Sequence, residues 1–250
     1  MATPLAMRSA NPALGAETFR GAPRAIGDEA MTIQGTVNKT ALALLVLLAA
    51  ATYVWNLGVH DPRLPVFVMV GVFGGLVVAM ATIFKQTWAP VTTPVYAALE
   101  GLALGGISVV FEARYPGLVS QAVFLTFGTL GALLMAYRSG LIKPTENFKL
   151  GVVAATGGIA LVYLISFVMS FFGASIPMIN SSGTLGIVFS LFVVGIAALN
   201  LVLDFDFIEQ GAARGAPKYM EWYGAFGLLV TLVWLYLEIL RLLAKLQDRR

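Results

Sequence analysis

The feature that most constrains this chain is a series of seven apolar stretches, each about as long as a membrane is thick. A helix needs about 20 mostly apolar residues to cross the hydrocarbon core of a bilayer. Only 12% of the 250 residues are charged, whereas about 25% is usual for a soluble domain. We therefore predict an all-α integral membrane protein with seven transmembrane helices in contact with the lipid bilayer. The predicted spans are 39–57, 65–84, 93–112, 118–137, 150–172, 184–208 and 219–243.

The segment before the first span has a different composition. Residues 1–31 mix Pro, Ala, Gly and Arg with a few acids and show no apolar period. We expect them to form a disordered cytoplasmic tail without a cleavable signal peptide. Residues 32–250 are expected to form a single seven-helix domain. Glycines recur in the second span (Gly71, Gly74 and Gly75) and in the fifth (Gly151, Gly157 and Gly158), where we expect helices to approach closely.

The distribution of basic residues predicts the orientation of the chain, because cytoplasmic loops of membrane proteins are enriched in Lys and Arg. With the N-terminus in the cytoplasm, the external loops hold only Arg63 and Arg114. The C-terminal tail is also basic, so the alternative of a re-entrant last segment stays open, although we favour seven crossings. The inside segments hold Arg8, Arg20, Arg24, Lys39, Lys85, Arg138, Lys143, Lys149, Arg214 and Lys218.

Several function classes are disfavoured by composition. The net charge is +3, but the basic residues stand singly between apolar runs, so we expect no nucleic-acid partner. The chain has no cysteine and one histidine, His60, which excludes thiolate chemistry and most metal-dependent membrane proteases. We find no phosphate loop, zinc-binding histidine pair or dinucleotide fingerprint. The sequence therefore predicts neither an enzyme nor a cofactor or metal site.

Four acidic residues lie within or at the ends of predicted spans, namely Glu100, Asp204, Asp206 and Glu238. Ionisable groups are costly in a bilayer and often mark the path of an ion or proton. Each acid could also have a purely structural role. Glu100 could be neutral and packed against a neighbouring helix, and Asp206 could lie at a solvated helix end. Glu238 could form an ion pair with Arg241 at i+3.

Asp204 is the strongest functional candidate of the four. It lies one turn after Asn200 and shares its face, whereas Asp204 and Asp206 are about 200° apart on a helix and cannot both face the same interior surface.

Long strings of the sequence resemble the Bax inhibitor-1 family of membrane proteins, in particular a bacterial branch. The resemblance covers roughly residues 31–246. It is carried by MTIQGTVNKT (31–40), YAALEGLALGGIS (96–108), AYRSGLIKPTENFKLGVVAATGGIALVYLISF (136–167), ALNLVLDFDFIEQG (198–211) and APKYMEWYGAFGLL (216–229).

The resemblance implies a fold in which six helices wrap a central seventh, and a pH-dependent calcium leak. The implied switch is a pair of aspartates on the last two helices that share a proton. The first matches Asp204 and the second falls on Glu238, where Glu replaces Asp. With a turn near residues 215–217, these two acids would differ in depth by roughly 15 Å. Pairing of Asp204 with Glu100 or Glu221 is therefore an open alternative.

These observations lead to a first hypothesis and its rivals. The first is a pH-sensitive cation leak, of calcium or protons, in a bacterial cytoplasmic membrane, with Asp204 as the main gating acid and Glu100, Glu238 and Asp206 in support. An alternative is a non-conducting regulatory subunit of a membrane protease or stress-response complex, with a membrane protein partner. A proton-coupled transporter is a weaker third, because the paired discontinuous helices and internal repeat usual in such folds are not found.

Overall fold

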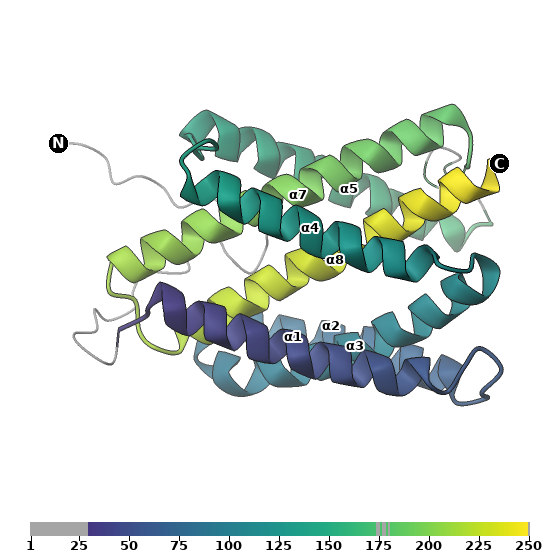
Figure 1. Cartoon of the computed structure of the whole chain (residues 1–250), viewed down its shortest axis with the longest axis horizontal. Coiled ribbons are helices and arrows are strands. Elements are labelled where there is room, and N and C mark those ends of the chain that lie inside the picture. Colours follow the sequence, from purple (N-terminus) through teal and green to yellow (C-terminus); the bar gives the residue numbers. More distant parts are fainter. Residues whose placement is uncertain (1–29, 174–175, 177–178, 180, 250) are drawn as a thin grey trace.

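The computed structural model describes residues 30–173, 176, 179 and 181–249, and their main elements are seven long helices (Figure 1). All seven are long and apolar enough to cross a membrane, which confirms the predicted all-α membrane fold. Residues 1–29 of the predicted tail (1–31) lie outside the described residues, and Met31 is buried. The helices are α1 (Ile33–Trp55), α2 (Leu64–Phe84), α3 (Ala89–Arg114), α4 (Leu118–Arg138), α5 (Glu146–Ser170), α7 (Thr184–Ala213) and α8 (Met220–Asp248), with a short 3-10 helix η2 (Gln86–Trp88) before α3.

The last helix, α8, is the most buried element of the described bundle. It runs diagonally between a group formed by α1, α2 and α3 and a group formed by α4, α5 and α7 (Figure 1). Of the six helices expected around it, α1, α3, α4 and α7 pack extensively on α8, whereas α2 packs on α3 and α5 packs on α7. Because α8 is one continuous helix of 29 residues, the last segment is a seventh span rather than a re-entrant loop.

The turn that joins α7 to α8 positions the buried ends of both helices. Gly215 has a φ of +68°, which a residue with a side chain rarely adopts, and it ends α7. The Ala216 amide donates to the Gly211 carbonyl at 3.1 Å, while the Ala216 carbonyl accepts from the Met31 amide at 2.6 Å. The chain just before α1 is therefore fixed to the α7–α8 turn.

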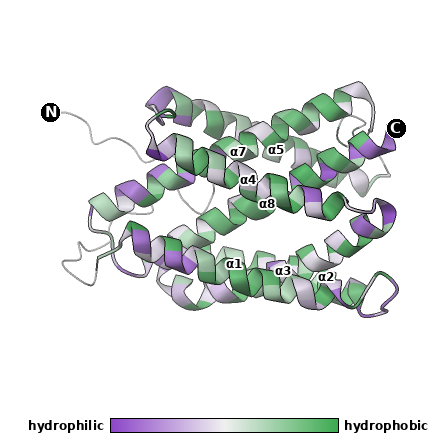
Figure 2. Cartoon of the chain, in the orientation of Figure 1, coloured by the Kyte–Doolittle hydropathy of each residue, from purple (hydrophilic) through white to green (hydrophobic). Residues whose placement is uncertain are grey.

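Most of the outer surface of the bundle is apolar, as contact with lipid requires. Large side chains such as Phe84, Phe124 and Val91 are 80%, 79% and 71% exposed. Hydrophilic residues gather toward the ends of the helices, and the middle of the bundle is hydrophobic (Figure 2). The exposed apolar surface is therefore the lipid-facing side of a multi-pass membrane protein.

Glycine allows close packing in the first group of helices but not in α5. A Cβ added to Gly71 of α2 would lie 2.6 Å from the backbone of α3 at Leu99 and Ala103, as expected for the second span. A Cβ on Gly101 of α3 would lie 2.3 Å from the Leu47 carbonyl oxygen of α1. In contrast, the three glycines of α5 have no described atom within 4 Å of an added Cβ. The expected close approach in the fifth span is therefore wrong, because these glycines face away from the other helices.

The close contact between α1 and α3 leads to a stability prediction. We expect Gly101→Leu to lower the free energy of unfolding by about 3 kcal/mol, the upper end of the usual cost of overpacking, because the new side chain would collide with the α1 backbone. Gly128→Leu on α4 is the matched control, since nothing lies within 4 Å of its added Cβ. Thermal unfolding in detergent measures both variants. Equal melting temperatures for the two would contradict the packing described here.

Candidate functional site

One face of α5 carries polar residues at a regular spacing. Lys149, Thr156 and Tyr163 are each seven residues apart, and Val152 and Ile159 lie between them on the same face. The only buried residues of α5 are Lys149, Val152 and Ile159. Each of the three polar residues contacts a polar side chain of α7 or α8. We call this set the polar seam, and it consists of Lys149, Thr156 and Tyr163 of α5, Asn200 and Asp206 of α7, and Glu238 and Arg241 of α8.

The first contact of the polar seam is a buried ion pair between α5 and α7. The Lys149 ammonium lies 2.7 Å from Asp206 Oδ2, and Lys149 is only 3% exposed. The Gln210 side-chain amide donates to the same carboxylate oxygen at 2.6 Å, and Glu146 lies 3.5 Å from the ammonium. Asp206, which the structural interpretation placed at a solvated helix end, is therefore a partner of Lys149.

The second contact lies two turns further along α5 and is a hydrogen bond between neutral side chains. Asn200 Nδ2 donates to Thr156 Oγ1 at 2.9 Å and to the Ile196 carbonyl at 2.8 Å. Asn200 is 1% exposed, and its Oδ1 has no hydrogen-bond partner within the part of the chain that the structure describes. Buried oxygen atoms are normally hydrogen-bonded, so Oδ1 is available to water or to a cation.

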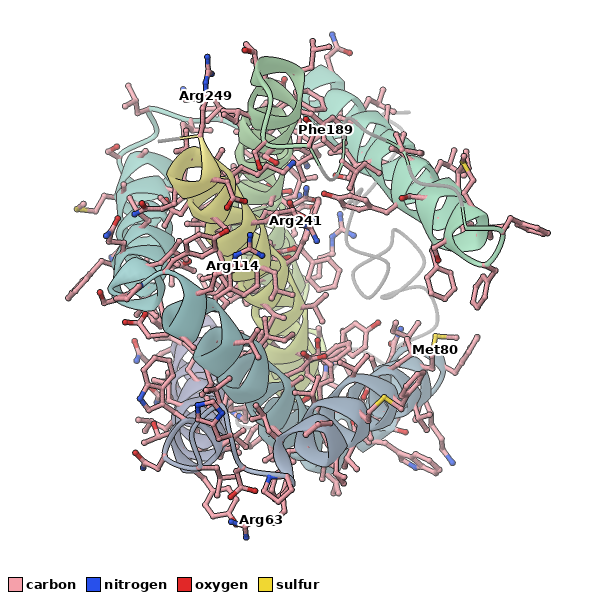
Figure 3. The ribbon with its side chains drawn as sticks, turned by 90° about the vertical axis from the view of Figure 1, so that its right-hand side faces the viewer. Arg63, Met80, Arg114, Phe189, Arg241 and Arg249 are labelled. Carbon is pink, nitrogen blue, oxygen red and sulfur yellow. The ribbon has the colours of Figure 1, made fainter. Side chains whose placement is uncertain are left out.

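The third contact joins α5 to α8 through three side chains. The Tyr163 hydroxyl donates to Glu238 Oε1 at 2.9 Å and accepts from Arg241 Nη1 at 2.7 Å. Arg241 Nη1 also donates to both carboxylate oxygens of Glu238, at 2.9 and 3.1 Å. Figure 3 shows Arg241 on α8, within the bundle when it is viewed from the end. Glu238 thus forms the ion pair with Arg241 that its spacing suggested, and the pair also binds α5.

Asp204 of α7 is fully buried, and α7 packs along α8. Two contacts fix how these antiparallel helices align: Ile208 lies beside Gly224, and Ser190 accepts a 2.8 Å hydrogen bond from Lys245. This alignment places Asp204 level with about residue 228 of α8. Glu238 lies about ten residues further along, which corresponds to about 15 Å. The structure therefore does not bring Asp204 and Glu238 together as a pair that shares a proton.

Glu100 lies apart from the polar seam, between α2 and α3. A Cβ added to Gly75 would lie 3.0 Å from Glu100 Oε1, so the carboxyl group faces α2. Tyr96 lies one turn before Glu100, and its side chain interacts with the Glu100 carboxyl group. These contacts agree with the packed arrangement considered for Glu100 from the sequence.

Glu221, considered from the sequence as a partner for Asp204, lies at the start of α8 and is bound to other side chains. Its carboxylate forms ion pairs with Lys39 and Lys218 and accepts hydrogen bonds from the Thr32 amide and hydroxyl at 2.9 and 2.8 Å. The side chain has no exposed surface, and a Cβ on Gly35 would overlap it. Glu221 therefore binds the start of α1 to the start of α8.

Two lysines and a tyrosine of this region were not identified from the sequence. From the sequence alone, Lys149 is placed among the cytoplasmic charges, and no prediction is made for Tyr163. Their seven-residue spacing from Thr156 is nevertheless the pattern of a polar helix face. Lys245 lies beyond the predicted last span (219–243), but it is 5% exposed and donates to the Gly186 carbonyl at 3.1 Å and to Ser190. No pattern in the sequence marks Lys245 as buried.

The chemistry available in the polar seam is that of dispersed oxygen atoms and paired charges. Within residues 30–249, as far as they are described, no three His, Cys, Asp or Glu side chains gather into a possible metal site. The carboxylates are instead spaced along the bundle, each among its own neighbours. Such an arrangement can pass a cation or proton along a series of weak positions, but it does not form a cage that would retain a metal ion.

Comparison with known proteins identifies one family. The family model described as Bax inhibitor 1 like matches residues 11–248. No curated protein and no solved structure matches the chain.

The buried ion pair leads to a prediction about α5. We expect Lys149→Met to destabilise the docking of α5 by up to about 3 kcal/mol, because it leaves the largely buried Asp206 carboxylate, whose side chain is 16% exposed, without its cation. Hydrogen–deuterium exchange over residues 146–170 should become faster than in the wild type. Lys143→Met is the matched control, since Lys143 is exposed in the preceding loop.

A second variant distinguishes loss of the pair from loss of packing. Lys149→Met combined with Asp206→Leu removes both charges and should restore slow exchange, because an apolar pair of similar volume can replace a buried ion pair. Exchange at the wild-type rate in Lys149→Met alone would contradict the role of this pair.

Proposed function

The chain belongs to the Bax inhibitor-1-like family, and we propose that it is a pH-sensitive cation leak that conducts calcium along the polar seam. The observation that carries this proposal is the series of buried and partly buried polar contacts that α5 makes with α7 and α8. A membrane helix buries such groups at a cost, and they commonly mark an ion path.

The polar seam supports a path because its oxygen atoms are spread over the length of α5. The ion pair at Lys149 and the hydroxyl of Tyr163 are 14 residues apart, which corresponds to about 21 Å of helix, or most of a bilayer core of about 30 Å. Between them lies Asn200, with a carbonyl oxygen open to a ligand. Hard cations such as calcium bind carboxylate, amide and hydroxyl oxygens.

The outer position of α5 supports its role as the moving element. It buries only three residues and packs chiefly on α7. Asp206 and Glu238 are bound to Lys149 and Arg241, so we assign these two acids to holding α5 in place. Displacement of α5 would open the polar seam to water while α8 kept its other contacts.

Asp204 is assigned the pH response because it is completely buried beside the polar seam. Ionising a buried carboxyl group costs free energy that its surroundings must offset, so the charge state of such a group is coupled to the packing around it. In the proposed scheme Asp204 is protonated while α5 is packed, and its carboxylate is hydrated or binds a cation when α5 is displaced. In this scheme the leak is closed at low pH and opens as pH rises.

We also propose that the N-terminus lies in the cytoplasm of a bacterial cell, in its cytoplasmic membrane. The bias of Lys and Arg supports this orientation. The start of α1 and the α7–α8 turn are joined by the bond between Met31 and Ala216, so both lie at the same end of the bundle. Asp206 and Lys149 are then near the cytoplasmic side, and Glu238 is nearer the other side.

Calcium flux into liposomes tests this function. We expect wild-type flux to be several-fold higher at pH 8 than at pH 6, and Asp204→Asn to give the low flux at both pH values, because its amide cannot ionise. Asp61→Asn is the matched control. The hydrogen bond from the Arg63 guanidinium lowers the pKa of Asp61 to about 2, so Asp61 stays ionised at both pH values and its removal should leave the pH response intact.

Two outcomes would overturn the proposal. Wild-type flux that is equal at pH 6 and pH 8, and equal in Asp204→Asn, would exclude gating by this acid. Flux no higher than in empty liposomes, together with stoichiometric co-purification of a membrane protein, would favour the alternative of a non-conducting regulatory subunit.

A further inference from the structure

A cavity of about 460 Å³ lies on the side of the bundle away from α5. Its walls come from α1, α3, α4 and α8. In Figure 1, α8 is visible between α4 and α1 along this side. The polar seam is formed by other helices and other faces of α8, so the cavity is a separate feature.

The walls of the cavity are almost entirely apolar. Leu47 of α1, Leu104 of α3, Val123 of α4 and Leu232 of α8 are typical of its lining. A ligand of this cavity would bury hydrocarbon against hydrocarbon and would find few hydrogen-bond partners along most of its length.

Polar side chains line one end of the cavity and are already bonded. Ser108 and Tyr236 share a hydrogen bond of 2.6 Å. The Glu112 carboxylate accepts from the Gly117 and Val119 amides at 2.6 and 3.1 Å. Glu112 therefore places a carboxylate at this end of the cavity, and two backbone amides hold it there.

The cavity opens sideways between α1 and α4. Both helices line it, yet α1 packs chiefly on α3 and α8, and α4 packs chiefly on α8 and α7. Three of the lining side chains are also on the outer surface: Leu48 is 41% exposed, Trp55 38% and Phe127 40%. Because these helices cross the membrane, the opening faces the hydrocarbon of the bilayer.

We propose that this cavity binds one acyl chain of a membrane phospholipid. The bilayer supplies such chains at the opening, and the volume lies within the usual range of about 300–1,000 Å³ for ligand sites. The headgroup stays at the membrane surface, so the apolar cavity needs no partner for it. A free fatty acid is disfavoured, because its carboxylate would meet the Glu112 carboxylate at the polar end of the cavity.

Photocrosslinking tests the proposal on the full-length protein in liposomes. The probe is a phosphatidylcholine with a diazirine in one acyl chain. We expect peptides of α1 and α4 that line the cavity to be labelled at least fivefold more than α2 and α5, which also face lipid. Val123→Trp, which fills the cavity from α4, should abolish this excess. Leu125→Trp is the matched control, because Leu125 is 49% exposed and does not line the cavity.

Further measurements distinguish loss of lipid binding from loss of folding. The melting temperature of Val123→Trp is compared with that of Leu125→Trp, and Val123→Phe is used if Val123→Trp does not fold. Equal labelling of all lipid-facing helices, or an excess that survives filling of the cavity, would overturn the proposal. Loss of the excess on addition of an equimolar free fatty acid would also overturn it, because the fatty acid would then be the preferred ligand.

Discussion

The arrangement of this protein depends on the need of polar groups in a bilayer to find partners inside the protein. Lys149 and Asp206 meet this need by pairing across the α5–α7 interface, and Tyr163, Glu238 and Arg241 meet it between α5 and α8. Lipid tails are as apolar as the side chains that face them, so apolar contacts give helices little free energy of association in a bilayer. The polar contacts therefore decide where α5 lies, and α5 in turn covers the region that we propose as the ion path.

The most buried helix, α8, borders both the polar seam and the apolar cavity and separates them. Its contacts with α5 and α7 include the polar seam and Lys245, and its contacts with α1, α3 and α4 border the apolar cavity. Glu221 anchors the start of α8 to Thr32 and Lys39. Movement of α5 can therefore change one side of α8 without unpacking the other.

The sequence predicted the seven spans closely, because long apolar runs bounded by turns have few other solutions in a membrane. It also placed Asp204, Asp206 and Glu238 within or at the ends of predicted spans, and the Glu238–Arg241 pair followed from their spacing. The partners from other helices could not be predicted. From the sequence alone, Lys149 is interpreted as a loop charge, and only the packing of α5 on α7 shows it to be the partner of Asp206. The glycines of α5 are interpreted as packing positions, but the structure shows that they face outward. Rotation of a helix about its axis is decided by its neighbours, which one sequence does not specify.

The most direct test of the central claim is a distance between α5 and the rest of the bundle as a function of pH. The sequence contains no cysteine, so spin labels can be placed at Leu161→Cys on α5 and Leu45→Cys on α1, which are 60% and 63% exposed. A pair at Leu45→Cys and Val77→Cys, within the α1–α2–α3 group, serves as the reference. The account predicts that the α5–α1 distance distribution shifts between pH 6 and pH 8, that Asp204→Asn abolishes the shift, and that the reference distance stays constant. An α5–α1 distribution that is identical at both pH values, in protein whose calcium flux still changes with pH, would contradict it.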